Sequence, residues 1–319
     1  MKKKIFSFFK SGGKFIGIFL IPFPVIRDFV FKIGIFFCRC LPDRIHLYTL
    51  PLFDEMGRIL YDKKLPKLFM SSVLGSRMIL DVSEKTQRQI YTQKIYEAGL
   101  VRYLALSLKP GDVFIDAGAN VGYFTLIGAS LVREKGIVIA IEPEKKNLQH
   151  LNNNLRLNGY QNVRIYECAV GSSKSMGVLN INPLNRGGNS MIPFSRYKSG
   201  EEIYSLEEIK RDYDTKDLYQ DIYIRTLDDI VQENNLENVS FIKMDVEGFE
   251  FEALKGMQEI ISKRKVKNVI CELSNIKNRK DIFDMFAKYK YKPYKLTFFG
   301  KRISIDTDDS SRDILFSLI

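Results

Sequence analysis

The sequence predicts an α/β fold in which a mostly parallel sheet carries helices on both faces. Short apolar runs, typical of buried strands, alternate with longer segments whose apolar residues recur at helical spacing. The clearest transition lies at Asp112–Leu126, where an apolar run ends in a glycine-rich turn and leads directly into an apolar helix. The chain has 319 residues, 45% of them hydrophobic, which is enough for a substantial core.

The expected elements follow one another from a turn at residues 109–112. The predicted strands are Val113–Ala117, Ile137–Glu142, Val163–Cys168, Ile222–Arg225, Ser240–Met244 and Val266–Leu273. The predicted helices are Phe124–Val132, Glu144–Leu157, Thr226–Gln232, Phe249–Ile261 and Arg279–Lys288. Tyr294–Phe299 and Asp313–Ile319 are expected to close the sheet as an antiparallel hairpin.

The regular alternation stops between the third and fourth of these strands. Residues 171–221 are rich in Ser, Asn, Gly and charge, and we expect them to form a polar insertion. Within it, Val178–Ile181 and Met191–Phe194 are predicted to pair as a hairpin, and a short helix is predicted near Leu206–Arg211. Insertions beside a sheet often shape a pocket or a lid.

The chain divides into three parts by composition. These are a basic, aromatic-rich N-terminal segment (1–50), a lead-in helical region (51–110) and the main domain (111–319) with its insertion. In the lead-in region, Met78–Val82 is a candidate strand. Ser83–Leu106 is a candidate helix with a break near Gly99.

The positive charge is concentrated at the N-terminus. Residues 1–50 hold nine Lys or Arg and two Asp, so +7 of the net +11 lies there. Phe15–Ile26 is uncharged, but it is too short to span a membrane and contains Pro22 and Pro24. We expect this segment either to lie on an anionic membrane surface or to pack on the main domain as a helical cap. The protein is accordingly expected to be cytoplasmic, or peripheral at the inner membrane face.

Cysteine and histidine usage excludes several kinds of chemistry. The four cysteines (Cys38, Cys40, Cys168 and Cys271) do not make a disulfide framework at this length, and we interpret them as free thiols. His46 and His150 are the only histidines. A multi-histidine metal site is therefore excluded, and a histidine base has almost no candidates.

The glycine-rich turn predicts a nucleoside-cofactor site. A strand followed by Gly118, Asn120 and Gly122 and then a helix presents free backbone N–H groups to a ligand. A dinucleotide site would place a second glycine where Asn120 stands, and its pyrophosphate would be repelled by Asp116. Asp116 suits an α-ammonium instead, so we predict S-adenosylmethionine (SAM). The alternative is that these glycines only permit a tight turn and that the acids cap helices.

The other predicted strand ends carry side chains that suit the same ligand. Parallel strands present their carboxyl ends at one edge of the sheet, where ligands bind. Glu142 is placed to accept hydrogen bonds from both ribose hydroxyls, and Cys168 and Ala169 are placed to flank an adenine. Asp245, Glu247 and Glu272 follow the later strands, where they could also bind a divalent metal, although no clear metal motif is present. Asp245 and Glu247 could instead cap the following helix.

Four motifs together resemble the FkbM-type family of SAM-dependent methyltransferases. They are FIDAGANVGYFT (114–125), AIEP (140–143), RTLDD (225–229) and FIKMDVEGFE (241–250). The resemblance runs from about Gly111 to about Leu273. It implies a class I methyltransferase (Rossmann-like) fold with a mostly parallel seven-stranded sheet, helices on both faces and a closing antiparallel hairpin. It also implies SAM-dependent O-methylation of a hydroxyl on a saccharide, lipid-linked glycan or natural-product acceptor.

The resemblance also implies roles for individual residues. Asp116, Gly118, Asn120 and Gly122 would hold the methionine end, Glu142 the ribose, and Cys168 and Ala169 the adenine; Lys243, Asp245 and Glu247 would face the acceptor. Because histidine is scarce, we expect Asp245 to act as the base and Lys243 to hold an oxyanion.

Two other functions stay open at this stage. The sequence pI of about 9.3 suits an RNA methyltransferase on the same fold. Against it, the excess charge is terminal, and K-M-D-V-E-G (243–248) stands where an N-P-P-Y-type base pocket would be. The second alternative is a non-enzymatic nucleotide-binding protein. We therefore expect a small-molecule or glycan acceptor and no nucleic-acid partner.

Overall fold

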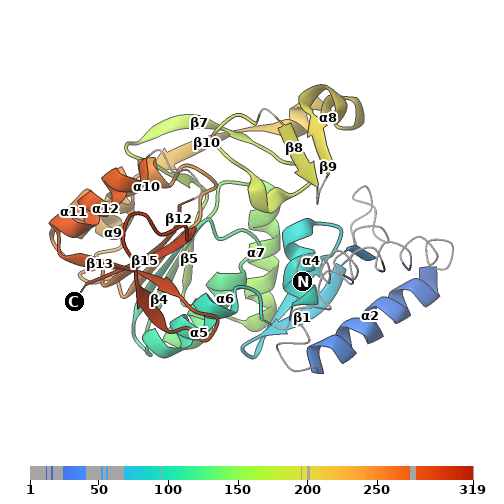
Figure 1. The fold of residues 1–319 in the computed structure, drawn as a ribbon, viewed down its shortest axis with the longest axis horizontal. Coiled ribbons are helices and arrows are strands. Elements are labelled where there is room, and N and C mark those ends of the chain that lie inside the picture. The colour runs from blue at the N-terminus through green and yellow to red at the C-terminus, as the bar shows by residue number, and fades with distance from the viewer. Residues whose placement is uncertain are drawn as a thin grey trace.

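A computed structural model gives the fold of the chain (Figure 1). It describes residues 24–40, 68–93, 95–194, 196–199, 202–273 and 278–318, with single positions at 12, 16, 52, 55 and 56. The predicted basic stretch before residue 24 therefore lies almost entirely outside the described residues.

The core of the fold is an eight-stranded sheet with the order β14-β13-β15-β12-β11-β3-β4-β5. Its parallel strands are β3 (Val113–Ala117), β4 (Ile137–Ile141), β5 (Val163–Tyr166), β11 (Phe241–Met244) and β12 (Asn268–Glu272). Its antiparallel edge consists of β15 (Asp313–Leu318), β13 (Tyr291–Leu296) and β14 (Arg302–Ser304). The α/β prediction and the closing hairpin are confirmed, and β14 is an additional short strand outside the predicted seven.

The two faces of the sheet bury alternate residues of each strand. Phe114, Phe241 and Ile270 belong to one apolar core, whereas Ile115, Ile242 and Val269 belong to the other. This explains why the strands read as continuous apolar runs, since both faces of a parallel sheet are covered. The first face is covered by α5 (Ala98–Ser107), α6 (Tyr123–Val132) and α7 (Lys145–Asn158). The second is covered by α9 (Leu227–Glu233), α10 (Glu250–Lys255), α11 (Gln258–Ser262) and α12 (Arg279–Lys288).

The predicted helix Phe249–Ile261 is divided into α10 and α11. The division lies at Gly256, where an added Cβ would stand 2.0 Å from the carbonyl oxygen of Gly171. The backbone of Gly256 also accepts a hydrogen bond from the N–H of Asp228. Close contact with the insertion and with α9, rather than local helix propensity, sets this break.

The lead-in region is more varied than the helical segment predicted from the sequence. β1 (Leu68–Val73) and β2 (Ser76–Asp81) form an antiparallel hairpin, so the strand near Met78 is confirmed and β1 was missed. The helical segment predicted at Ser83–Leu106 is confirmed as two helices, α4 (Lys85–Thr92) and α5, but the break predicted near Gly99 lies earlier, at residues 93–97. Gly99 lies inside α5, where an added Cβ would meet the carbonyl oxygen of Thr297 at 2.6 Å.

The insertion lies over the carboxyl ends of the central strands (Figure 1). β10 (Tyr219–Arg225) pairs with β6 (Ala169–Val170) and β7 (Ser175–Asn180), so the predicted strand at Ile222 lies outside the central sheet. The predicted hairpin is wrong, since only an isolated bridge joins Asn180 to Ser190. The insertion also contains η1 (Arg186–Gly188), β8 (Arg196–Ser199), β9 (Glu202–Ser205), α8 (Leu206–Asp212) and η2 (Thr215–Leu218). α8 confirms the predicted helix and begins with a capping box of Ser205 and Glu208.

The N-terminal segment contributes a helix, α2 (Pro24–Cys40), to the described residues. It begins at Pro24, a residue favoured in the first helical turn. Its Phe31 and Ile35 are buried against the lead-in region, which supports the packed interpretation for this face. Within the described ranges, no helix has the length and apolar character needed to cross a membrane. Cys40, Cys168 and Cys271 are free thiols, and the side chain of Cys38 is not described.

Asn154 fastens the lead-in hairpin to the main sheet, which leads to a prediction about stability. Its Oδ1 accepts a hydrogen bond from the N–H of Ile79 at 2.8 Å, and its Nδ2 donates to the carbonyl of Val121 at 2.9 Å. Asn154→Ala leaves both buried groups unpaired and should lower the free energy of unfolding by about 2–4 kcal/mol. Asn153→Ala, at an exposed position of the same helix, should change it by less than about 0.5 kcal/mol. Denaturant titration measures both, and equal effects would contradict the fastening role.

Candidate active site

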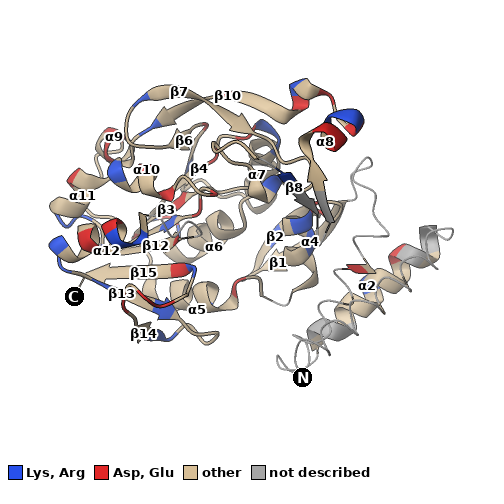
Figure 2. Cartoon of the chain, turned by 45° about the horizontal axis from the view of Figure 1, so that its top comes forward, with Lys and Arg blue, Asp and Glu red and all other residues tan. Residues whose placement is uncertain are grey.

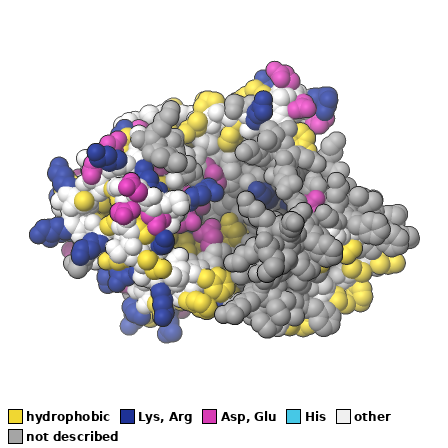
Figure 3. All heavy atoms as spheres, in the orientation of Figure 1, with side chains coloured by type: hydrophobic (Ala, Val, Ile, Leu, Met, Phe, Trp, Pro, Cys, Tyr) yellow, Lys and Arg dark blue, Asp and Glu magenta, His cyan; other side chains and the backbone are white. Residues whose placement is uncertain are grey.

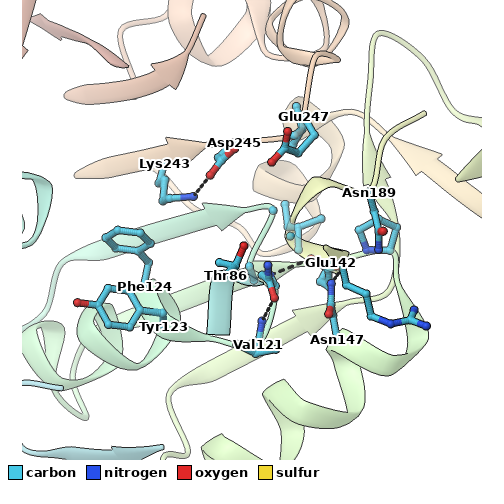
Figure 4. Close-up of a pocket in the computed structure, with 18 of the residues that line it drawn as sticks. Thr86, Val121, Tyr123, Phe124, Glu142, Asn147, Asn189, Lys243, Asp245 and Glu247 are labelled. Carbon is cyan, nitrogen blue, oxygen red and sulfur yellow. Dashed lines mark hydrogen bonds and ion pairs between the residues drawn. The ribbon is translucent and has the colours of Figure 1, made fainter. Parts of the chain in front are cut away.

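A cavity that is partly open to solvent lies at the carboxyl ends of β3, β4 and β11. The space inside it that can hold the centre of a water molecule is about 160 Å3. Glu142, Asn147 and Asn189 lie on one side of it, and Lys243, Asp245 and Glu247 on another (Figure 4). In the surface view, acidic side chains gather around a hollow in the middle of this face of the molecule (Figure 3).

The glycine turn after β3 forms through three residues in left-handed conformations. Gly118, Asn120 and Gly122 have φ angles of +84°, +50° and +94°. An added Cβ on Gly118 would lie 1.9 Å from the carbonyl oxygen of Asp245, so only glycine allows β3 and β11 to approach here. At Gly122 an added Cβ would lie 2.6 Å from the Leu151 side chain, which ties this glycine to packing against α7.

The turn does not offer the free N–H groups expected from the sequence. The N–H groups of Gly118 and Ala119 donate to the carbonyl of Ile141, and that of Gly122 donates to Ala119. The N–H of Asn120 donates to Glu142, and Asn120 Oδ1 accepts from the N–H of Val121. The turn is therefore tied to β4 by its own hydrogen bonds, and side chains and shape, rather than these amides, must recognise the ligand.

Glu142 is the best-oriented carboxylate on this side of the cavity. Oε2 accepts the Asn120 N–H at 2.8 Å, and Oε1 accepts from the Glu144 N–H at 3.0 Å and from Asn147 Nδ2 at 3.2 Å. Burial raises the pKa of Glu142 to about 7, although these hydrogen bonds act in the opposite direction. A carboxylate held in this way presents its remaining lone pairs in a fixed direction, which suits a pair of ribose hydroxyls.

Asp116 takes a different position from the one predicted. Its side chain is fully buried and does not line the cavity. Asp116 Oδ2 accepts from the Thr125 hydroxyl at 2.7 Å, and burial raises the pKa of Asp116 although Lys243 nearby opposes this. Gly122 likewise does not line the cavity. Of the predicted cofactor residues, five line the cavity: Gly118, Asn120, Glu142, Cys168 and Ala169.

The three predicted catalytic residues lie together at one end of the cavity. Lys243 Nζ is 3.1 Å from Asp245 Oδ2 and 5.0 Å from the centre of the Phe124 ring. Burial disfavours the Lys243 ammonium, but the carboxylates of Asp245 and Asp116 outweigh it and raise the pKa of Lys243. Asp245 Oδ1 has no hydrogen-bond partner among the described residues.

Glu247 reaches the same end of the cavity from a strained backbone conformation with φ of +51°. Part of its side chain reaches solvent, yet the surrounding protein desolvates its carboxylate. Together with the nearby Asp245, this raises the pKa of Glu247 above its usual range. The helix-capping interpretation is wrong, because Glu250 accepts from the N–H groups of Val246 and Gly248 instead. No group of metal-binding side chains is found within the described residues.

Tyr96 and Glu97 line the cavity from the segment between α4 and α5, and neither was predicted from the sequence. Glu97 has a φ of +47°, and its carboxylate lies near Lys243 and Asp245. Burial is the main cause that raises the pKa of Glu97 to about 7, and burial also raises that of Tyr96. Glu97 lies inside a segment predicted to be helical, where charged residues are common, so nothing in the sequence indicated that its side chain lines the cavity.

The insertion forms the roof of the cavity. Arg186 donates to Glu144 at 2.9 Å, Thr86 Oγ1 donates to Asn185 Oδ1 at 3.0 Å, and the Ser190 hydroxyl donates to the carbonyl of Glu247 at 2.6 Å. Asn189 lines the cavity, and its buried Nδ2 has no hydrogen-bond partner in the described part of the chain. The sequence predicted an insertion that shapes the pocket, but not which of its residues face inward.

These features fit an adenosyl ligand. The buried Asn189 Nδ2 is a donor in need of an acceptor, and Glu142 is an oriented acceptor. Burial raises the pKa of Cys168 to about 11, so the thiol beside Ala169 is neutral and the slot suits an uncharged ring. The strand order, with an antiparallel strand beside β12, and a site at the carboxyl ends of β3 and β4 define a class I SAM-dependent methyltransferase.

The chain belongs to the family defined by the methyltransferase FkbM domain, whose model matches residues 116–293. Over 187 residues it is 28% identical to the methyltransferase sdnD of Sordaria araneosa, covering 54% of this chain and 68% of that protein. It is 25% identical over 181 residues to methyltransferase 1 of Beauveria bassiana, and the match covers 55% of this chain and 68% of that protein.

Among solved structures, a methyltransferase FkbM from Methylobacillus flagellatus is similar. It has 20% identity and a TM-score of 0.40, and the match covers 72% of this chain and 54% of that one. The present chain thus matches about half the length of that protein. An O-methyltransferase from Thermotoga maritima has 13% identity and a TM-score of 0.37, and the match covers 83% of this chain and 82% of that one.

The close approach at Gly118 predicts the effect of a substitution. Gly118→Ala adds left-handed strain of about 1–2 kcal/mol and forces the end of β11 to move, so SAM affinity should fall at least about tenfold. Gly159→Ala is the matched control, because Gly159 also has a positive φ (+68°) but open space around its Cβ position. Calorimetry with SAM should show near-normal binding for the control. Normal binding by Gly118→Ala would contradict the described packing of β3 against β11.

The raised pKa of Glu142 predicts a pH dependence of cofactor binding. The ionised carboxylate, the form predicted to accept hydrogen bonds from ribose hydroxyls, predominates above about pH 7 and is lost as the pH falls below it. SAM affinity should therefore weaken by up to about tenfold for each pH unit below 7. Glu142→Gln should bind more weakly at neutral pH and lose this dependence. Calorimetry across the range measures both, and parallel pH profiles for the two proteins would assign the titration to another group.

Proposed function

We propose that this enzyme transfers the methyl group of SAM to a hydroxyl of a neutral, polyhydroxylated acceptor, such as a saccharide, lipid-linked glycan or natural product. The observation that carries this proposal is the pairing of a base and a cation at one end of the cavity. Lys243 is buried and paired with Asp245, whose second carboxylate oxygen has no partner among the described residues. SAM supplies an electrophilic methyl group when bound, so the protein must position the hydroxyl and remove its proton.

Asp245 and Lys243 have different roles in this reaction. Asp245 lines the cavity, and its Oδ1 is buried without a partner among the described residues, so this oxygen is the one assigned to accept the hydroxyl proton. The Lys243 ammonium stabilises the negative charge that develops on the acceptor oxygen. The Lys243 side chain is buried and its Nζ lies against the Phe124 ring, so little water screens its interaction with Asp245. A neutral hydroxyl needs such a base, because its proton must leave as the new C–O bond forms.

The charge around the acceptor end supports a neutral acceptor over a phosphorylated one. Glu97, Asp245, Glu247 and Glu272 line the cavity there; Lys243 is paired with Asp245, and Arg312 is paired with Glu272. Carboxylates repel phosphate and accept hydrogen bonds from hydroxyls. Glu97 and Glu247, with raised pKa values, can also donate when protonated. This arrangement favours a polyol and disfavours the backbone of a nucleic acid, which supports an acceptor other than RNA.

The base assignment predicts the kinetics of a conservative variant. Asp245→Asn removes the proton acceptor and should lower kcat by about 10²–10⁴-fold, with SAM affinity nearly unchanged. Asp284→Asn, at an exposed position on α12, is the matched control and should keep wild-type kcat. The assay is transfer of a radiolabelled methyl group from SAM to a cellular lipid and glycan extract, followed by identification of the labelled species.

Three outcomes would count against the proposal. Asp245→Asn with a kcat within a few-fold of wild type would remove Asp245 from the base role. Label that appears on RNA but not on lipid or glycan would favour the nucleic-acid alternative. Failure of the wild type to bind SAM would contradict the enzyme assignment itself.

A further inference from the structure

Helix α2 carries apolar residues on two opposite faces. Phe31 and Ile35, four residues apart, are buried on the inner face. The outer face carries a stripe at spacings of three and four, which on a helix is one continuous face. We call this set the outer stripe: Ile26, Phe29, Val30, Ile33 and Phe36. Phe29 is 64% exposed, an unusual position for a large aromatic side chain.

The inner face fixes α2 to the folded body, so the direction of the stripe is set by packing. The Phe31 ring lies 6.1 Å from the rings of both Phe69 and Tyr91, measured between centroids, and the Lys32 ammonium lies 4.6 Å from the Phe69 centroid. These partners belong to β1 and α4, which are part of the main apolar core. The part of the outer stripe from Ile26 to Ile33, about 10 Å long at 1.5 Å per residue, is on the opposite side of the helix from these contacts and is exposed (Figure 3).

The charge of the surrounding sequence indicates what the outer stripe contacts. The first 50 residues carry nine Lys or Arg and two Asp, whereas most of the described length of α2 is uncharged (Figure 2). An apolar helix face within a segment of large net positive charge is the combination found in helices that lie in the headgroup region of an anionic bilayer. A partner surface that is purely apolar would not need the basic residues, and an acidic soluble partner would not need the stripe.

We propose that the outer stripe of α2 docks the enzyme on the surface of an anionic lipid bilayer, with α2 parallel to the membrane plane. Ile26, Phe29 and Ile33 enter the boundary between headgroups and acyl chains, and the net positive charge of the segment attracts anionic headgroups. The inner face stays packed on the lead-in region, so the methyltransferase body is held at a fixed orientation to the membrane. This docking is independent of the identity of the methyl acceptor.

The absence of tryptophan from the chain allows a direct test. Phe29→Trp, in the full-length protein, introduces a single indole into the outer stripe. Its emission should shift to shorter wavelength when vesicles of phosphatidylglycerol and phosphatidylcholine are added, and should stay unchanged with phosphatidylcholine alone. The matched control is Leu106→Trp, at a 66% exposed position on α5, which should show no shift with either vesicle.

A second pair of measurements separates docking from folding. In flotation with the same vesicles, Phe29→Ser/Ile33→Ser should bind at least about tenfold more weakly than wild type, because two apolar side chains no longer enter the membrane. Leu106→Ser should float like wild type. Both variants should keep the wild-type melting temperature, since neither changed position is in the core.

Other occupants of the stripe would give different results, each of which overturns the proposal. An indole at position 29 that is already shielded before vesicles are added would show that another part of the chain covers the stripe. A shift that depends on protein concentration, with a change in mass by sedimentation, would identify a second copy as the partner. Equal flotation by wild type and the double variant, or equal binding to neutral and anionic vesicles, would exclude the stated docking mode.

Discussion

The buried ammonium of Lys243 is the interaction on which the rest of the site depends. A charge with a side-chain exposure of 5% has lost most of its hydration and requires opposite charges beside it. Strand register supplies the first, because Lys243 on β11 stands directly beside Asp116 on β3. Asp245, two residues further on, supplies the second and lines the cavity. The same parallel pairing that builds the sheet thus places a cation between the buried carboxylate of Asp116 and the cavity-lining carboxylate of Asp245.

The remaining parts of the cavity wall come from outside the regular α/β alternation. Glu97 arrives from the link between α4 and α5, and Asn189 from the insertion. The family match covers residues 116–293, so Glu97 and α2 both lie outside it. Both ends of the cavity therefore combine residues of the sheet with residues of its additions: Lys243 lies near Glu97, and Glu142 lies on the same side as Asn189. Loops change more readily than paired strands, so the parts that the additions contribute are those expected to vary.

The central strands could be predicted because burial on both faces makes each an uninterrupted apolar run. Glu142 could be predicted because it directly follows such a run. Asp116 was predicted to face the ligand, but it lies within its strand beside Lys243, and no sequence pattern showed which face that position would occupy. The free amides predicted at Gly118 were used instead in hydrogen bonds to Ile141, since the left-handed turn folds back on the neighbouring strand. The sequence also could not show which face of α2 packs on the body and which is exposed, because that depends on the segments beside it.

The sequence by itself determined the α/β class, the glycine turn, the order of most strands and the carboxylates at their ends. These follow from local rules, because periodicity, turn residues and the parallel arrangement act over short stretches of chain. Only the tertiary structure decided which of those side chains share a cavity and which lie behind its wall. It also brought in Glu97 and Asn189, whose positions depend on contacts between segments far apart in the chain. Packing between distant segments sets the direction of each side chain and the pKa of each carboxylate, and neither can be predicted from the local pattern of residues.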